Sequence, residues 1–475
     1  MTTANRISAL FLLVASLTMP AQSLATSLLE VYQQALQSDP RIHEAEALRL
    51  AALEAEPQAR GVLLPQVGFS GDWTKTESSG TSIGEDQSGN FGVFGSETDS
   101  EVTRWQFSLR QTLFRWDQIV GLRRADKLVA KAEAQREAAQ QDLIVRVAQR
   151  YFDVLAAEDR LTSIHADRTA IARQLEQAKQ RFEVGLIAIT AVQESQAAYD
   201  QAVADEIAAK RFLATAREFL REITGEYVST LSAPGDDFPL VSPDPASEAS
   251  WVDLALNQNL LLVASRLDEE LARDEISFRR NGYYPSIELV ATSGESETTA
   301  DRSVNRGPFF PANSDGQADS IGIQFSLPLF AGGTTSSRVR EAVYLHRASR
   351  EQLQRVTRET ERQARDAYLG VASEISRVKA LDQAVRSSRT ALEATQAGFE
   401  VGTRTIVDVL NSQFALYLAI TNFYQSRYNY ILNVLQLKQA AGTLQIQDLE
   451  DVDRWLKERK PPEQSIAEEG SNGQR

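Results

Sequence analysis

Residue types that carry enzyme or metal chemistry are sparse in this chain and far apart. The sequence contains no cysteine, and its three histidines, His43, His165 and His346, are separated by more than 100 residues. Disulfides, thiolate metal sites and cysteine nucleophiles are therefore excluded, and a centre built on histidine is not expected. The sequence also lacks a set of nucleophile, base and acceptor and a glycine-rich phosphate loop. These features predict a protein that is not an enzyme and holds no metal or cofactor.

The charge balance and the first residues indicate an acidic, exported protein. Lysine and arginine total 50 and aspartate and glutamate 65, and the net charge of −15 disfavours nucleic acid as a partner. Residues 1–25 place Arg6 before an apolar run and end in Ser23-Leu24-Ala25, which predicts a secretory signal peptide. No later stretch has the roughly 18 consecutive apolar residues of a membrane helix. Entry into a membrane would therefore have to use strands.

The sequence contains an internal duplication. Arg181–Gln196 aligns with Gly398–Gln413, which pairs Gly185 with Gly402, and the same offset of 217 residues pairs Gly225 with Gly442. Such long repeats exceed the periods of solenoids, which are about 20–50 residues, and indicate two halves of one architecture. We therefore divide the chain into a signal peptide (1–25), a first repeat (26–227), a proline-containing linker (228–250), a second repeat (251–444) and a C-terminal segment (445–475) whose polar end is predicted to be disordered.

Each repeat is predicted to contain a β-hairpin, at residues 66–113 and 286–330. In the first strand, apolar or small side chains at 67, 69, 71 and 73 alternate with polar or small ones, and the strands of the second repeat alternate similarly. We expect strands of about 9–11 residues with one apolar and one polar face, the length that crosses a membrane. The segments 77–101 and 294–319, rich in glycine, serine and acidic residues, are expected to be solvent loops. The same alternation would also suit half-buried hairpins of a soluble sheet.

Inside a membrane, four strands from one chain would leave two open edges. Each unpaired N–H or C=O group in hydrocarbon costs several kcal/mol, so the sheet must close on itself. Because the smallest bacterial barrels need about eight strands, several copies of the chain must combine their hairpins. Two, three or four copies would give eight, twelve or sixteen strands, and this reasoning does not choose between them.

Very long helices are predicted directly after the hairpins. No proline interrupts the stretch from Trp116 to Val184, and at 1.5 Å per residue a continuous helix would reach about 100 Å. Apolar residues recur at heptad spacing in both repeats, at Leu161, Ile164, Ile171, Leu175 and Phe182, and at Leu381, Val385, Leu392 and Phe399. A strand barrel that continues into a ring of helices explains both features. The alternative is a soluble periplasmic coiled-coil adaptor or scaffold, which would not need the alternating strands.

Four stretches of the chain resemble the TolC family of outer membrane efflux proteins of Gram-negative bacteria. They are RFEVGLIAITAVQ from Arg181, REITGEY from Arg221, SLPLFAGG from Ser326 and VGTRTIVDVLN from Val401, and the similarity extends over about residues 26–450. The resemblance implies a mainly α fold with a transmembrane β-barrel. In it, a homotrimer forms a 12-stranded barrel in outer-membrane lipid, four strands per chain, continuous with a 12-helix periplasmic tunnel. The implied function is an exit duct for drug efflux or type I secretion, coupled to an inner-membrane pump through a periplasmic adaptor.

Two glycine turns carry the predicted adaptor contacts. Gly185 and Gly402 each follow a valine at the end of a long helix, where a left-handed cap favours glycine. These turns should return the chain into an antiparallel helix. The resemblance further implies that Val184, Gly185 and Leu186, together with Val401, Gly402 and Thr403, line the grooves where adaptor hairpins dock.

Near these turns the resemblance implies a periplasmic gate. It assigns four residues to the latch and constriction of a closed tip: Gln180, Thr190, Arg404 and Asp408. The family pattern has tyrosine where Phe399 stands and aspartate where Ala191 and Asn411 stand. Phe399 therefore lacks the tyrosine hydroxyl of the latch and Ala191 lacks its carboxylate acceptor. We expect the closed tip to be held less firmly than in the family.

Two further gate residues follow from this comparison. Glu194, one helical turn beyond Thr190, is a candidate to receive Arg404 in place of the missing acceptor. Three-fold symmetry would convert Asp408 into a ring of three carboxylates that attracts cations, with a neutral ring at Asn411. The alternative for Asp408 is an ordinary solvated acid on a helix surface.

Overall fold

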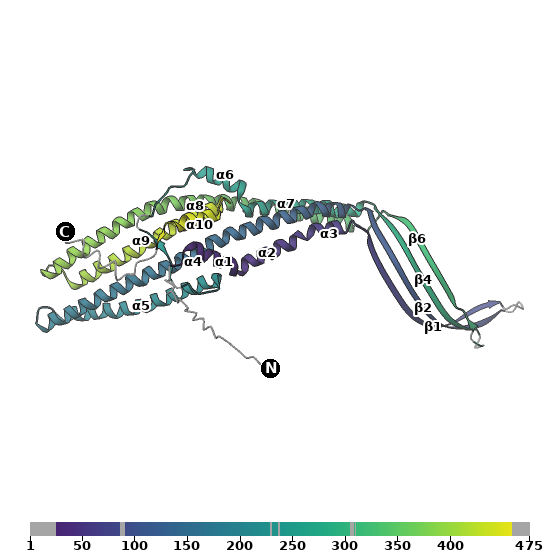
Figure 1. Ribbon diagram of the computed structural model, residues 1–475, viewed down its shortest axis with the longest axis horizontal. Coiled ribbons are helices and arrows are strands. Elements are labelled where there is room, and N and C mark those ends of the chain that lie inside the picture. The colour runs from purple at the N-terminus through teal and green to yellow at the C-terminus, as the bar shows by residue number, and fades with distance from the viewer. Residues whose placement is uncertain are drawn as a thin grey trace, which may run out of the picture.

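The chain forms one elongated molecule with a sheet at one end and two helical hairpins at the other (Figure 1). The computed structural model describes residues 25–85, 91–228, 230–235, 238–304, 308 and 310–457. Residues 1–24 of the expected signal peptide and residues 458–475 of the expected disordered tail lie outside the described residues.

The two repeats contain the same succession of elements. The first has α1 (Leu28–Ser38), α2 (Pro40–Leu53), α3 (Ala55–Gly61), β1 (Gln66–Glu85), β2 (Phe91–Phe114), α4 (Trp116–Glu183) and α5 (Ile189–Thr224). The second has α6 (Glu248–Gln258), α7 (Leu260–Arg279), the 3₁₀ turn η1 (Arg280–Tyr283), β4 (Ser286–Val304), β5 (Phe310–Pro311), β6 (Ser314–Ser326), α8 (Thr334–Glu400) and α9 (Ile406–Ala440). The short strand β3 (Ala233–Pro234) pairs with β7 (Leu456–Lys457), which follows α10 (Ile446–Asp453).

The main sheet joins the hairpins of both repeats. Its antiparallel order is β1-β2-β4-β6, with β5 also pairing with β4, so the repeats meet at β2 and β4, and β1 and β6 are the outer strands. The register aligns the apolar faces, because Val67 lies opposite Leu109, Leu109 opposite Ala291, and Ala291 opposite Ile321. One face of the sheet therefore carries an apolar band built from all four strands.

The strands are longer than the sequence predicted. They span 20, 24, 19 and 13 residues for β1, β2, β4 and β6. Much of the expected loop regions is paired strand, as Glu77 opposite Asp99 and Gly294 opposite Ala318 show. The expectation of solvent loops at 77–101 and 294–319 was therefore wrong. Antiparallel pairing satisfies the backbone N–H and C=O groups whatever the side chains are, so a strand continues where the apolar alternation stops.

The expectation of very long helices is confirmed. Helices α4 and α8 span 68 and 67 residues, and each pairs with the helix that follows its turn. In the described part of the chain, no helix is both long enough and apolar enough to cross a membrane.

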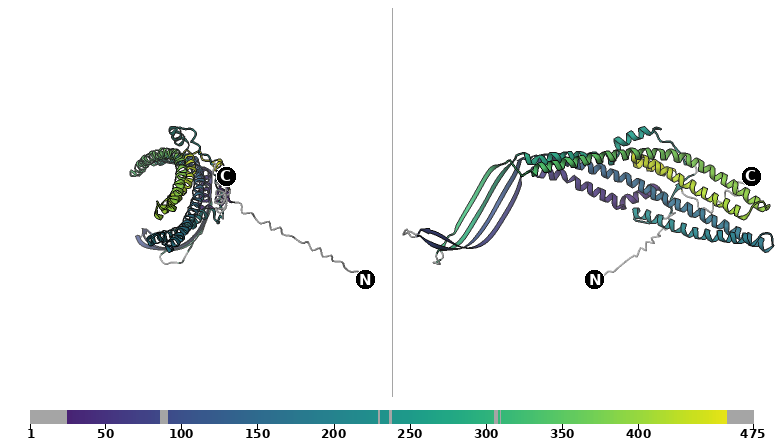
Figure 2. Two further views of the ribbon diagram at one scale, coloured as in Figure 1. Left: turned by 90° about the vertical axis from the view of Figure 1, so that its left-hand side faces the viewer. Right: turned by 180° about the vertical axis from the view of Figure 1, so that it is seen from behind.

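The main hydrophobic core lies halfway along the helices, where α1, α4, α9 and α10 meet. Tyr151 and Phe152 of α4 are buried there, and the Phe152 ring stacks on Tyr428 of α9 at 5.4 Å between centroids. The Tyr151 hydroxyl donates to the Ser232 carbonyl at 2.6 Å, which ties the linker to the core. Beyond this core the two hairpins extend as a curved wall of helices (Figure 2). Their tips are held mainly by contacts within and between the hairpins.

Candidate functional site at the helical hairpin tips

The two hairpin tips contain the same backbone turn. In the first, the Leu186 N–H donates to the Arg181 carbonyl at 2.9 Å and the Gly185 N–H to the Phe182 carbonyl at 2.9 Å. In the second, Thr403 donates to Gly398 at 2.8 Å and Gly402 to Phe399 at 3.1 Å. Both glycines have left-handed backbone, with φ of 77° and 82°. This is the Schellman geometry, in which a side chain at the glycine position would be strained.

The turns expose apolar side chains at the end of the molecule. Val184 is 69% exposed, Leu186 is 73% exposed and Val401 is 76% exposed. Thr403 differs from its counterpart Leu186, because its hydroxyl donates to the Gly398 carbonyl at 3.0 Å. The first turn thus presents two apolar side chains and the second presents one.

The return helices α5 and α9 begin differently. At the start of α9, the Asp408 N–H donates to the Thr405 hydroxyl at 3.3 Å, while the Thr405 N–H and hydroxyl donate to Asp408 Oδ2 at 2.9 Å each. This capping box satisfies N–H groups that the first helical turn leaves unpaired. Helix α5 has Ala188 at the equivalent position, with no side-chain cap, and Ala191 in place of Asp408.

The environment of Asp408 favours its ionised form. The N–H of Thr405, then its hydroxyl, and to a smaller extent the charge of Arg404 hold the pKa of Asp408 below its usual range. Both hydrogen bonds reach Oδ2, and no hydrogen bond or ion pair to Oδ1 is formed within the described residues. Asp408 is therefore a helix cap that keeps its charge and one oxygen for other contacts.

One contact between the hairpins was not expected from the sequence. The Arg181 guanidinium of α4 lies over the Phe399 ring of α8, 4.8 Å from the ring centroid. A phenyl face attracts a cation at this distance, so Arg181 links the first tip to the second. Gly398, the neighbour of Phe399, would place a Cβ 2.8 Å from Arg404 Cγ, and its lack of a side chain lets Arg404 pack there.

The other expected gate residues do not meet within one chain. Gln180 donates to Glu176 of its own helix at 3.2 Å. Thr190 and Glu194 are exposed near the start of α5, and across the described residues no ion pair joins Glu194 to Arg404. In the part of the chain that the structure describes, no group of three or more histidine and carboxylate side chains is placed to hold a metal ion.

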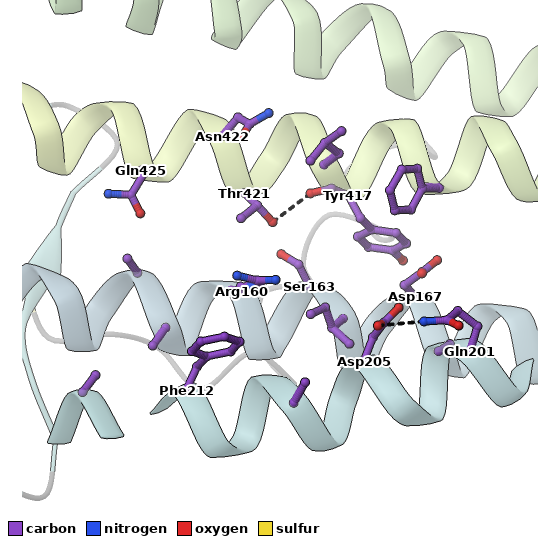
Figure 3. A pocket seen from close by; sticks show the side chains of 18 of the residues that line it. Arg160, Ser163, Asp167, Gln201, Asp205, Phe212, Tyr417, Thr421, Asn422 and Gln425 are labelled. Carbon is purple, nitrogen blue, oxygen red and sulfur yellow. Dashed lines mark hydrogen bonds between the residues drawn. The ribbon is translucent and has the colours of Figure 1, made fainter. Parts of the chain in front are cut away.

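Asn411 lies away from the turns and lines a cavity of about 950 Å³ between α4, α5 and α9. The side chains of Asp167, Asp205 and Tyr417 project into the same cavity (Figure 3). Sequence reasoning missed the cavity, because its lining combines the hairpin of α4 and α5 with α9, which lies about 200 residues further along the chain. The capping residue Thr405 was missed as well, although a threonine three residues before an aspartate matches the spacing of a capping box.

Comparison with known proteins gives consistent matches along the chain. The outer membrane efflux protein family matches residues 31–226 and 251–443. The outer membrane protein TolC of Vibrio cholerae is 37% identical over 456 residues, covering 96% of this chain and 100% of the relative. The alkaline protease secretion protein AprF of Pseudomonas aeruginosa is 29% identical over 428 residues, covering 90% and 86%. Among solved structures, the outer membrane protein VceC of Vibrio cholerae aligns with a TM-score of 0.69 at 19% identity, covering 87% and 96%.

Proposed function

The chain belongs to the outer membrane efflux protein family, and from this premise we propose that three copies form a duct through the outer membrane and into the periplasm. An adaptor protein and an inner-membrane pump deliver cargo to the periplasmic end. The two relatives named for TolC and for alkaline protease secretion support efflux or type I secretion as the process served. Residues 26–227 and 251–444 supply the two halves of each subunit.

The open sheet is the observation that carries this proposal. Within one chain the outer edges of β1 and β6 face no partner strand among the described residues. The apolar band on one face suits lipid, and backbone groups at an edge in lipid must be paired. Pairing β6 of one copy with β1 of the next keeps the sheet antiparallel and closes it. Three copies give twelve strands.

The helices then form the periplasmic part of the duct. With 68 residues, α4 is about 100 Å long at 1.5 Å per residue. Such a length places the hairpin tips far from the membrane, where the exposed Val184, Leu186 and Val401 are available to an adaptor. We assign adaptor docking to Val184, Gly185, Leu186, Val401, Gly402 and Thr403.

The gate is assigned to the same tips. The ionised Asp408 would repeat three times around the axis and concentrate cations there, with Asn411 as a neutral ring beyond it. Phe399, Arg404, Gln180, Thr190 and Glu194 complete the proposed constriction. Their contacts would form between copies or in another state of the tip, because they do not form within one chain.

Single-channel recording in planar bilayers tests the proposal. The purified mature protein should insert and conduct in discrete steps, and divalent cations added to the helical side should reduce the current. Asp408→Asn should weaken this block while leaving the number of insertions unchanged. Protein that fractionates with the outer membrane but never conducts would contradict the duct.

A further inference from the structure

The cavity between α4, α5 and α9 contains two carboxylates that have no cationic partner. Gln413 Nε2 donates to Asp167 Oδ1 at 2.8 Å, and Gln201 Nε2 donates to Asp205 Oδ1 at 3.0 Å. Within the described residues, neither aspartate forms an ion pair. Burial, and the nearby charge of Asp205, raise the pKa of Asp167. At the end of the cavity where they lie, the carboxylates of Asp167 and Asp205 thus accept hydrogen bonds from amides, but no cation neutralises their charge.

The same cavity exposes aromatic surface. Phe212 of α5 is 56% exposed and Phe414 of α9 is 63% exposed, and both line the cavity together with Tyr417. The Arg160 guanidinium already lies 5.3 Å from the centroid of the Phe212 ring, so this ring accepts a cation within the chain. Figure 3 shows Asp167 and Asp205 near Tyr417, with Arg160 further along α4 toward Gln425. The acidic end is therefore separated along the cavity from Arg160 and also from Arg150, the second arginine of the lining, which pairs with Asp153 at 3.5 Å.

We propose that this cavity binds an amphipathic organic cation. The apolar body of the ligand packs on Phe212 and Phe414, and its charged group lies between Asp167 and Asp205. The volume of about 950 Å³ falls in the usual range for small-molecule sites. An inorganic cation would use the carboxylates but leave the aromatic rings in water. The chemistry of the lining therefore favours a ligand that is both apolar and cationic.

The role of the site as a cargo station in the wall of the duct rests on the proposed function. Binding itself rests only on the cavity. The two are separated experimentally, because one preparation of the protein can be used both for ligand titration and for single-channel recording. Conduction without binding removes this inference and leaves the duct intact, whereas binding without conduction removes the duct.

Ethidium is a suitable probe, since it is aromatic, cationic and fluorescent. Full-length mature protein in detergent should bind it saturably above the signal of detergent alone. The double variant Asp167→Asn/Asp205→Asn should bind about tenfold more weakly or worse, because a desolvated charge contact is lost. Phe414→Ala should also weaken binding.

Asp200→Asn is the matched control. Asp200 lies on α5 one turn and a half before Asp205 and accepts a hydrogen bond from Gln196 Nε2 at 2.9 Å, yet it does not line the cavity. The affinity of the Asp200→Asn variant for ethidium should equal that of the unaltered protein. Equal binding by the double variant, or the absence of saturable binding, would overturn the inference. Absence is also the result expected if a second copy covers the cavity.

A folding failure of the double variant would not leave the question open. Competition on the unaltered protein then decides, with tetraphenylphosphonium as the cationic competitor and 8-anilinonaphthalene sulfonate as the anionic one. Displacement of ethidium by the cation alone supports the site. Equal displacement by both competitors contradicts it, because the carboxylates would then have no influence.

Discussion

The two hairpin tips have the same turn but unequal chemistry. Gly185 and Gly402 both adopt left-handed backbone and close the same pair of hydrogen bonds. The helix after the second turn begins with the Thr405–Asp408 capping box, whereas the helix after the first has Ala188 and no side-chain cap. The duplication has thus retained what the backbone requires, while the polar groups of the tip are concentrated on the second hairpin.

A second pair of equivalent glycines extends the comparison. Gly225 ends α5 and Gly442 follows α9, with φ of 79° and 74°. A Cβ at Gly225 would meet only the Ser38 side chain at 3.4 Å, but a Cβ at Gly442 would lie 2.2 Å from the Gln258 carbonyl oxygen. The second repeat therefore depends on glycine for close backbone approach as well as for conformation.

The largest effect should come from Gly442→Ala. Left-handed backbone costs an alanine roughly 1–2 kcal/mol, and overpacking adds about 1–3 kcal/mol. The matched Gly225→Ala pays only the first cost, so its thermal transition, followed by circular dichroism in detergent, should shift less. Equal shifts for the two variants would contradict the close approach at Gly442.

Removal of the cap should have the next largest effect. Thr405→Ala should destabilise the first turn of α9 by about 1 kcal/mol, which corresponds to roughly fivefold faster amide exchange there. The converse pair Ala188→Thr/Ala191→Asp should slow exchange at the start of α5, because it copies the capping box into the first repeat. If both tips exchange at the same rate before any substitution, the proposed inequality is wrong.

The contact between the tips predicts a smaller change. Arg181→Met keeps a flexible unbranched stem but removes the guanidinium over Phe399, at a cost of about 0.5–1 kcal/mol. The closed tip should loosen, and the single-channel conductance should rise. Lys179→Met, two residues earlier on the same exposed helix, serves as the control and should leave the conductance unchanged.

The smallest effect concerns pH. Because the folded pKa of Asp408 is lowered by its bonds to Thr405, the cap stabilises α9 fully above the ordinary aspartate pKa of about 3.9. That stability is lost as the pH falls through the lower, folded pKa. Amide exchange corrected for intrinsic rates should therefore show the first turn of α9 losing protection in acid. The first turn of α5, with Ala191, should show no such step.

Features with a periodic or steric origin could be predicted from the sequence. The offset of 217 residues, the heptads and the absence of proline gave the repeats and the long helices, and the turn glycines gave the hairpins. The strands were found, but their length was underestimated, because polar residues in β1 and β2 continue the pairing without any alternation. The gate assignments came from family resemblance, except that of Glu194, which came from its position one helical turn beyond Thr190.

Contacts between distant segments could not be predicted in this way. Arg181 meets Phe399 only because the end of α4 comes close to the end of α8 at the tips, and no local pattern at either residue encodes that approach. Likewise, Asp167, Asp205 and Tyr417 belong to three helices and have unremarkable neighbours in sequence. Thr405 is different, since its spacing to Asp408 was visible and the cap could have been read directly.

The proposed duct depends most on the closure of the four-stranded sheet by three copies of the chain. Native mass spectrometry of the mature protein released from detergent counts those copies directly. Closure by three copies predicts a single dominant species of three chains, which supplies twelve strands and leaves no edge unpaired. A stable monomer or dimer, unchanged across detergents, would contradict closure and with it the duct, the ring of Asp408 carboxylates and the proposed gate.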